Sequence, residues 1–193
     1  MRGYSVTLPR RSLRQPQPNM NPGGDCAACA LGGALGLTVP EVYARLREGK
    51  IQGATWFDAR DALHRARAAG LADRIIVDVP IWPWAGYEPR AWFGLAASAQ
   101  AMPWFAHLRM ALDAGYYGIA EVSYRRAGPL GLPDHQVLLC GVREVWPEEG
   151  VGGVIRHEVL VSCSAGAAEE WVDVDDFLTQ RGGFNVLLVR PTP

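Results

Sequence analysis

The chain has 193 residues, a formal net charge of −1 and 20% charged residues. This length suits one domain with a well-buried core and is too short for two domains that each have such a core. The near-neutral charge gives no reason to expect a nucleic-acid or membrane surface. The four cysteines are too few for a disulfide scaffold and fit a reducing compartment. We therefore expect a single globular domain over residues 1–193.

The amino-terminal segment carries four arginines, but the apolar run of a secretory signal does not follow them. No apolar stretch reaches the roughly 18 residues that a membrane span requires. These features predict a cytoplasmic protein. Export as an effector, by a route that needs no cleaved signal, is the alternative.

Residues 1–20 contain three prolines and predict an extended amino-terminal arm. The loop residues Asn21–Gly24 follow, and Asp25 is a favourable N-cap for a helix over residues 26–36. This helix consists almost entirely of small apolar residues and includes two adjacent glycines, which weaken an isolated helix. Such a helix must be central and tightly packed in order to form.

Further helices and then strands follow. Thr38 is a capping residue for the next helix, and residues 57–69 and 104–114 predict two more helices that end at glycines. Strands are predicted over residues 74–79, 117–124, 136–142, 155–162, 170–172 and 185–189, with a short helix over 173–180. Helices before antiparallel strands indicate an α+β fold, with a mainly helical half over 21–115 and a mainly β half over 116–193.

Two short segments carry the chemistry. Cys26 and Cys29 stand near the start of the small-residue helix, and His135 opens an apolar strand. A thiol attacks a carbonyl carbon well only as the thiolate, and a helix N-terminus and a neighbouring histidine both lower its pKa. This combination predicts a cysteine-dependent acyl-transfer enzyme that needs neither an organic cofactor nor a metal.

Several segments resemble those of papain-like cysteine peptidases. Cys26–Leu31 is similar to their Cys-Gly-Ser-Cys-Trp-Ala segment, and Asp134–Val142 to their Asp-His-Ala-Val-x-x-Val-Gly-Tyr strand. Val159–Gly166 is similar to their Ile-Leu-Ile-Lys-Asn-Ser-Trp-Gly strand. Glu170–Leu178 resembles the end of bacterial members of the clan, including bacteriocin-processing peptidases. Residues 21–30 resemble, more loosely, the opening of papain-fold toxins and glutamine deamidases.

The resemblance implies a papain-like fold, in which the nucleophile helix packs on an antiparallel β half and the active site lies between them. It implies a bacterial hydrolase, either a peptidase or a deamidase, with His135 as the base and a peptide or protein as the substrate. The nucleophile stays open, because the helix-mouth position favours Cys26 whereas alignment to papain favours Cys29. The likeness to toxins adds an inhibitor or immunity protein as a further partner.

The chain departs from the family pattern at two positions. The Asn or Asp that orients the imidazole is matched by Cys163, and a thiol is a weak hydrogen-bond partner. Ser162, Cys163 and Ser164, or a backbone carbonyl, are therefore the candidates for this role. The family's oxyanion glutamine has no match, and Asn21 is the nearest candidate for that amide.

Two other interpretations follow from these residues. The departures also fit a catalytically inactive papain-fold module that binds a peptide or a protein. The Cys-x-x-Cys spacing suits zinc, and a metal site could be built from Cys26, Cys29, Cys140 and His135. That site would lack the second close-spaced cysteine pair of most structural zinc centres.

Overall fold

The computed structural model describes residues 3–15, 25–46, 59–76, 98–122, 135–147, 153–165, 169–181 and 186–193. In these ranges the chain forms five helices and seven strands, and every strand pairing is antiparallel. The helices are α1 (Cys26–Leu35), α2 (Val39–Leu46), α3 (Ala59–Ala68), α4 (Ser98–Asp113) and α5 (Val174–Arg181). The strands are β1 (Ser5–Thr7), β2 (Ala72–Ile76), β3 (Tyr117–Val122), β4 (His135–Val145), β5 (Arg156–Ser162), β6 (Glu170–Asp173) and β7 (Val186–Pro191). The predicted α+β class is confirmed.

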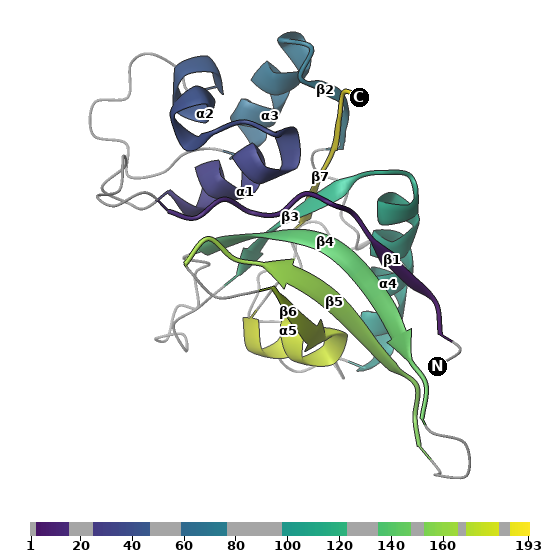
Figure 1. Cartoon of the computed structure of the whole chain (residues 1–193). Coiled ribbons are helices and arrows are strands. Elements are labelled where there is room, and N and C mark those ends of the chain that lie inside the picture. The colour runs from purple at the N-terminus through teal and green to yellow at the C-terminus, as the bar shows by residue number, and fades with distance from the viewer. Residues whose placement is uncertain are drawn as a thin grey trace.

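One antiparallel sheet holds all the described strands, in the order β2-β7-β3-β4-β5-β6 (Figure 1). The long strand β4 pairs with β3 over residues 135–139 and with β5 further along. The amino-terminal strand β1 pairs with residues 141–143 of β4, where β5 already occupies the other side. β1 therefore lies on the same side of β4 as β3, further along that strand. The amino-terminal arm is thus part of the sheet.

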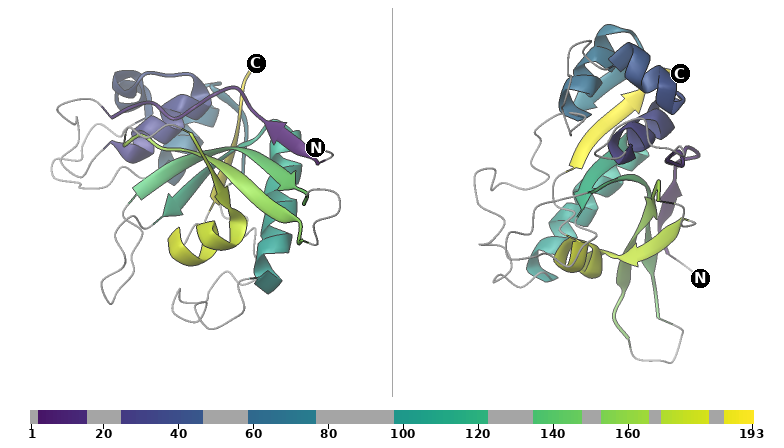
Figure 2. Two further views of the ribbon diagram at one scale, coloured as in Figure 1. Left: turned by 60° about the horizontal axis from the view of Figure 1, so that its bottom comes forward. Right: turned by 90° about the vertical axis from the view of Figure 1, so that its left-hand side faces the viewer.

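Helices cover both faces of this sheet (Figures 1 and 2). One core cluster joins α1, α2 and α3 to sheet residues such as Leu138 and Cys140, and a second joins α4 and α5 to residues such as Val137 and Leu139. Alternate residues of β4 thus enter opposite cores, as the two-residue period of a strand requires. The helices predicted over 21–115 do not form one layer, because α4 lies on the face opposite α1.

The small residues of α1 allow its close packing. Nine of its ten residues are buried, and a Cβ at Gly33 would lie 2.1 Å from the backbone oxygen of Arg11. Only glycine permits the amino-terminal arm to pass so close to the helix. The helix ends at Gly36, whose φ of 75° is left-handed. The predicted central, tightly packed helix is confirmed.

The capping predictions have different outcomes. Thr38 and Glu41 form the expected reciprocal capping box at the start of α2, and Gly70 and Gly115 adopt left-handed conformations after α3 and α4. The side chain of Asp25 does not cap α1, contrary to the prediction. It is buried instead, and its Oδ1 accepts a hydrogen bond of 2.6 Å from the hydroxyl of Tyr43.

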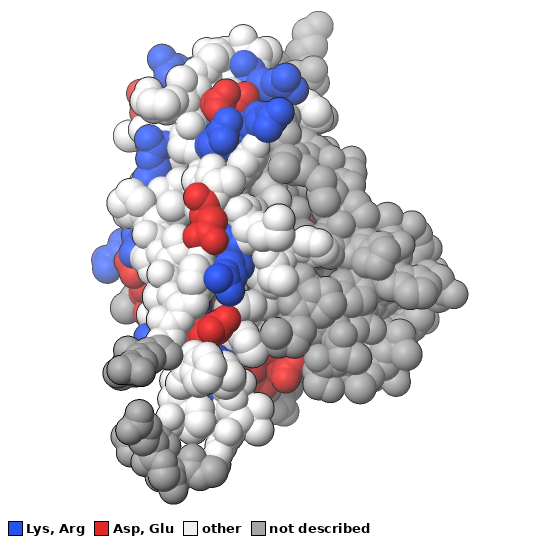
Figure 3. Space-filling view, turned by 90° about the vertical axis from the view of Figure 1, so that its right-hand side faces the viewer, with Lys and Arg blue, Asp and Glu red and all other residues white. Residues whose placement is uncertain are grey.

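On the face drawn in Figure 3, acidic and basic side chains are interspersed over the described part of the chain. Ion pairs join neighbouring elements of the fold, such as Arg109 with Glu144 and Arg143 with Glu158. Among the described residues, none of the helices is by itself long and apolar enough to cross a membrane. Helices α1 and α2 reach that length and composition only as a pair, which is bent by 92°.

Candidate active site

Three elements bring the candidate residues together at their ends. Cys26 is the first residue of α1, and His135 is the first residue of β4, on which α1 packs directly. Cys163 follows the last residue of β5, the neighbour of β4 in the sheet. The fold therefore places two thiols from distant parts of the sequence beside one imidazole.

The thiol of Cys26 is hydrogen bonded to the side chain of His135. Burial by itself raises the pKa of this thiol. The hydrogen bond to His135, the charge of its ring and the backbone N–H groups of Gln136 and Ala27 act in the opposite direction. The net pKa of Cys26 lies below its ordinary value, which favours a thiolate.

The imidazole of His135 also contacts Cys163, with 3.3 Å between Nε2 and Sγ. Burial by itself lowers the pKa of His135. The hydrogen bonds with Cys163 and with Cys26 raise it by more, so that the net pKa is about 9. The ring is therefore protonated at neutral pH. The pKa of Cys26 is lowered and that of His135 is raised, so both shifts act in the direction of a thiolate beside an imidazolium.

Backbone N–H groups support both sulfur atoms. The helix-mouth amide was expected, whereas sequence reasoning missed the N–H groups of Gln136 and Ala165. The N–H groups of Ala27 and Gln136 hydrogen bond to Cys26, and the N–H of Ala165 lies 3.3 Å from Sγ of Cys163. The first two belong to the residues that directly follow Cys26 and His135. That adjacency is visible in the sequence, but the direction of each N–H is set only by the folded chain.

Cys29 and Cys140 have a different environment. Both are fully buried in the core cluster that includes α1. Burial raises the pKa of each thiol to about 12, so both are protonated at neutral pH. The thiol of Cys140 donates a weak hydrogen bond to the backbone oxygen of Leu160, at 3.7 Å. These two cysteines are placed as small core residues.

The remaining candidates lie around this group. Ser162 and Ser164 are buried, and their hydroxyls accept hydrogen bonds from the amino-terminal arm, from the N–H of Ser12 and the side chain of Gln15. Of the three candidates for orienting the imidazole, the contact to Nε2 at 3.3 Å is made by Cys163. Asn21, the predicted oxyanion donor, lies outside the described residues.

A metal centre finds no support in this geometry. Within the described ranges, no three Cys, His, Asp or Glu side chains are arranged to hold a metal ion. Two of the four predicted zinc ligands, Cys29 and Cys140, are buried thiols with a pKa of about 12, whereas a metal requires thiolates. Comparison of the chain with family models, curated proteins and solved structures gives no match.

Proposed function

We propose that this protein is a cysteine-dependent acyl-transfer enzyme, a hydrolase that acts on a peptide bond or a side-chain amide. The observation that carries this proposal is the contact between Cys26 and His135, with the pKa of the thiol lowered and that of the imidazole raised. Opposite shifts in two touching groups are typical of an activated nucleophile and its base. Neither a metal nor an organic cofactor is needed.

The reaction would proceed in two stages. The Cys26 thiolate attacks the carbonyl carbon of the amide, and the imidazolium of His135 gives its proton to the departing nitrogen as the C–N bond breaks. The product of this stage is a thioester on Cys26. A water molecule then loses a proton to the neutral His135 and attacks the thioester, which releases the acid and restores the ion pair.

Negative charge moves from sulfur to the carbonyl oxygen during the attack. The backbone N–H groups of Ala27 and Gln136 already stabilise charge at the sulfur. Donors fixed in this position can also hydrogen bond to a carbonyl oxygen bound beside the sulfur. They can therefore stabilise the charge that develops on that oxygen, with no reorganisation at the moment of reaction. We propose that these amides, together with Asn21 from outside the described residues, form the oxyanion hole.

Cys163 takes the place of the asparagine or aspartate that orients the imidazole in papain-like enzymes. Its Sγ lies 3.3 Å from Nε2 and itself accepts a hydrogen bond from the N–H of Ala165. A papain-like fold belongs to the same proposal. It is supported by a nucleophile helix packed on an antiparallel sheet, with the histidine at the start of one strand and its partner just after the next.

The test is alkylation of the reduced native protein with iodoacetamide over a series of pH values, with the labelled residue identified by mass spectrometry. We expect Cys26 to react at a pH well below the ordinary thiol pKa of about 8.5. In a His135→Ala variant the same reaction should occur only near that ordinary value. Slow labelling with an ordinary pH dependence in both proteins would favour an inactive binding module instead.

The raised pKa of His135 gives the test a second arm. Iodoacetate is an anion and is attracted by the imidazolium, whereas iodoacetamide is neutral. The ratio of the two labelling rates should be high at neutral pH and should fall as the pH passes about 9, where the ring loses its proton. Acyl transfer should decline over the same range, because the leaving group then lacks its acid.

A further inference from the structure

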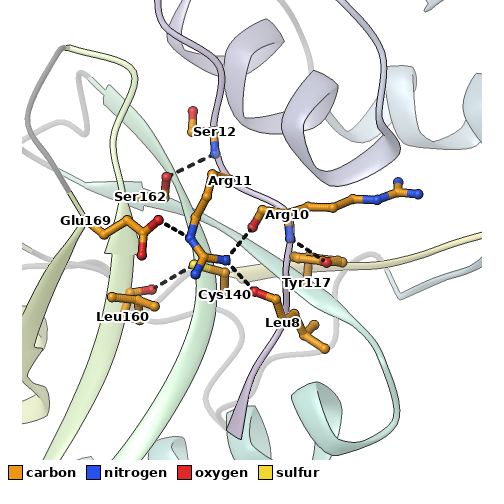
Figure 4. A network of polar contacts seen from close by, with 9 residues as sticks. All are labelled: Leu8, Arg10, Arg11, Ser12, Tyr117, Cys140, Leu160, Ser162 and Glu169. Atoms are coloured by element: carbon orange, nitrogen blue, oxygen red, sulfur yellow. Dashed lines mark hydrogen bonds and ion pairs between the residues drawn. The ribbon is translucent and has the colours of Figure 1, made fainter.

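The amino-terminal arm runs alongside the candidate site. Its residues 10–15 pass between α1 and the end of β5, and Figure 4 shows the contacts around Arg10, Arg11 and Ser12. The N–H of Leu13 donates to the backbone oxygen of Cys29 at 3.1 Å, so the arm is fixed to the nucleophile helix. The same short segment therefore contacts the element that carries Cys26 and the strand end that carries Cys163.

The arm holds both chain neighbours of Cys163. The N–H of Ser12 donates to Oγ of Ser162 at 3.0 Å. Gln15 contacts Ser164 twice, through its backbone N–H to the backbone oxygen at 3.1 Å and through Nε2 to Oγ at 3.2 Å. Ser162 and Ser164 are 5% and 2% exposed, so these bonds are protected from water.

We propose that Gln15 is a positioning residue of the site, which fixes Ser164 and thereby holds the Sγ of Cys163 at Nε2 of His135. Cys163 lies at the end of a strand, where it enters a turn. Without an external anchor, the position of a side chain in such a turn is weakly determined. The paired bonds from Gln15 supply that anchor from outside the turn.

The exposed ion pair between Arg11 and Glu169 joins the arm to the chain beyond this turn, but it is a weaker anchor. Both side chains are partly exposed, at 29% and 42%, and exposed ion pairs contribute little to stability. Figure 4 shows that this ion pair starts from Arg11 of the arm, next to the contact between Ser12 and Ser162. The buried contacts of Gln15 are therefore the ones that we expect to determine the position of Cys163.

This position has a measurable consequence at His135. Cys26 from α1 and Cys163 from the turn after β5 are the titratable groups that raise the pKa of His135 to about 9. If Cys163 moves away, one of these two contributions is lost, and the titration midpoint of the ring must fall toward the ordinary value. The inference rests on the proposed function for its catalytic meaning, but the midpoint can be measured whether or not Cys26 is a working nucleophile.

The experiment is an NMR pH titration of the His135 Cε1–H resonance, assigned with a His135→Gln variant. Gln15→Met keeps the side-chain length but removes the donor, and we expect it to lower the midpoint by about half a pH unit or more. Arg14→Met is the matched control, because Arg14 is exposed on the same arm, and its midpoint should equal that of the wild type. Cys163→Ala should lower the midpoint at least as much, and the double variant Gln15→Met/Cys163→Ala no further.

An unchanged midpoint in Gln15→Met, with a lowered one in Cys163→Ala, would overturn the inference and leave the proposed function intact. An unchanged midpoint in both variants would overturn it as well. If Gln15→Met fails to fold, Ser164→Ala removes the acceptor hydroxyl of the same bond and must show the same shift. Slow labelling of Cys26, together with a lowered midpoint in Gln15→Met, would contradict the proposed function but not the inference.

Discussion

The first and the fourth residue of α1 are both cysteines, but their surroundings differ sharply. Cys26 and Cys29 stand less than one turn apart on the same helix. Burial raises the pKa of both thiols. At Cys26 the imidazole of His135 and two backbone N–H groups outweigh this effect, whereas at Cys29 nothing offsets it, and the pKa reaches about 12.

The difference shows that a helix N-terminus alone does not lower the pKa of a cysteine thiol. Both sulfurs lie near the start of α1, but of the two only Cys26 lies at the ends of the neighbouring strands, beside a histidine and the backbone N–H group of Gln136. The middle of the helix contributes to packing, because its glycines let the amino-terminal arm pass over it. The lowered thiol pKa and the close packing of the arm thus belong to different parts of one ten-residue helix.

Replacing each cysteine by alanine is the sharpest test of this comparison. Cys26→Ala should abolish labelling at mildly acidic pH and lower kcat by a factor on the order of 10³ or more, with the fold retained. Cys29→Ala should keep the rate and the pH dependence of Cys26 labelling, and should lose only about 1 kcal/mol of unfolding free energy, because a small buried group is deleted. Loss of activity in Cys29→Ala alone would reverse the comparison and would support the alignment to papain.

The middle of α1 can be tested through its glycines. In Gly33→Ala the new methyl group would lie 2.1 Å from the backbone oxygen of Arg11, so the arm must move. We expect the variant to lose about 3 kcal/mol of unfolding free energy, or to fail to fold. Denaturant unfolding followed by circular dichroism measures this loss.

Gly70→Ala is the control for backbone conformation. Gly70 has a left-handed φ of 71°, but nothing lies within 4 Å of its added Cβ. The expected loss there is about 1 kcal/mol, which reflects the left-handed conformation alone. Equal losses in the two variants would show that the arm yields easily, and would contradict the close packing that we describe for the middle of α1.

The parts of the structure that were predicted from the sequence rest on local chemistry. Thr38 with Glu41 forms a capping box because both groups lie within one turn, and Gly70 ends a helix because it alone adopts a left-handed conformation there without strain. The packing of α1 followed from its composition, since a helix so rich in small residues and glycine is stable only inside a core. The α+β class followed from the order of these local patterns.

The other parts depend on contacts between residues distant in the sequence. The burial of Asp25 depends on Tyr43 from the next helix, so its carboxylate does not serve as the expected cap. The different contacts of Ser162, Cys163 and Ser164 also involve distant residues, since the arm binds the two serines and the thiol contacts the imidazole. The position of α4 opposite α1 depends on the sheet as a whole.

Replacing Tyr43 tests a small expected effect. Its hydroxyl acts on the start of α1 and not on the thiol of Cys26. It donates to Oδ1 of Asp25 at 2.6 Å, and Asp25 is fully buried. Tyr43→Phe should therefore lose about 1.5 kcal/mol of unfolding free energy, as expected for a hydrogen bond to a buried acceptor. Tyr4→Phe removes an exposed hydroxyl that is bonded to Asp113, and should lose about 0.5 kcal/mol or less.

The labelling profile of Cys26 decides what the result means. The charge of Asp25 is among the causes that raise the pKa of Cys29, whereas the pKa of Cys26 is set by burial, by His135 and by backbone N–H groups. Tyr43→Phe should therefore weaken the fold and leave the pH dependence of Cys26 labelling unchanged. A shift in that dependence would show that the first turn of α1 relies on the Asp25–Tyr43 contact for its chemistry as well as for its stability.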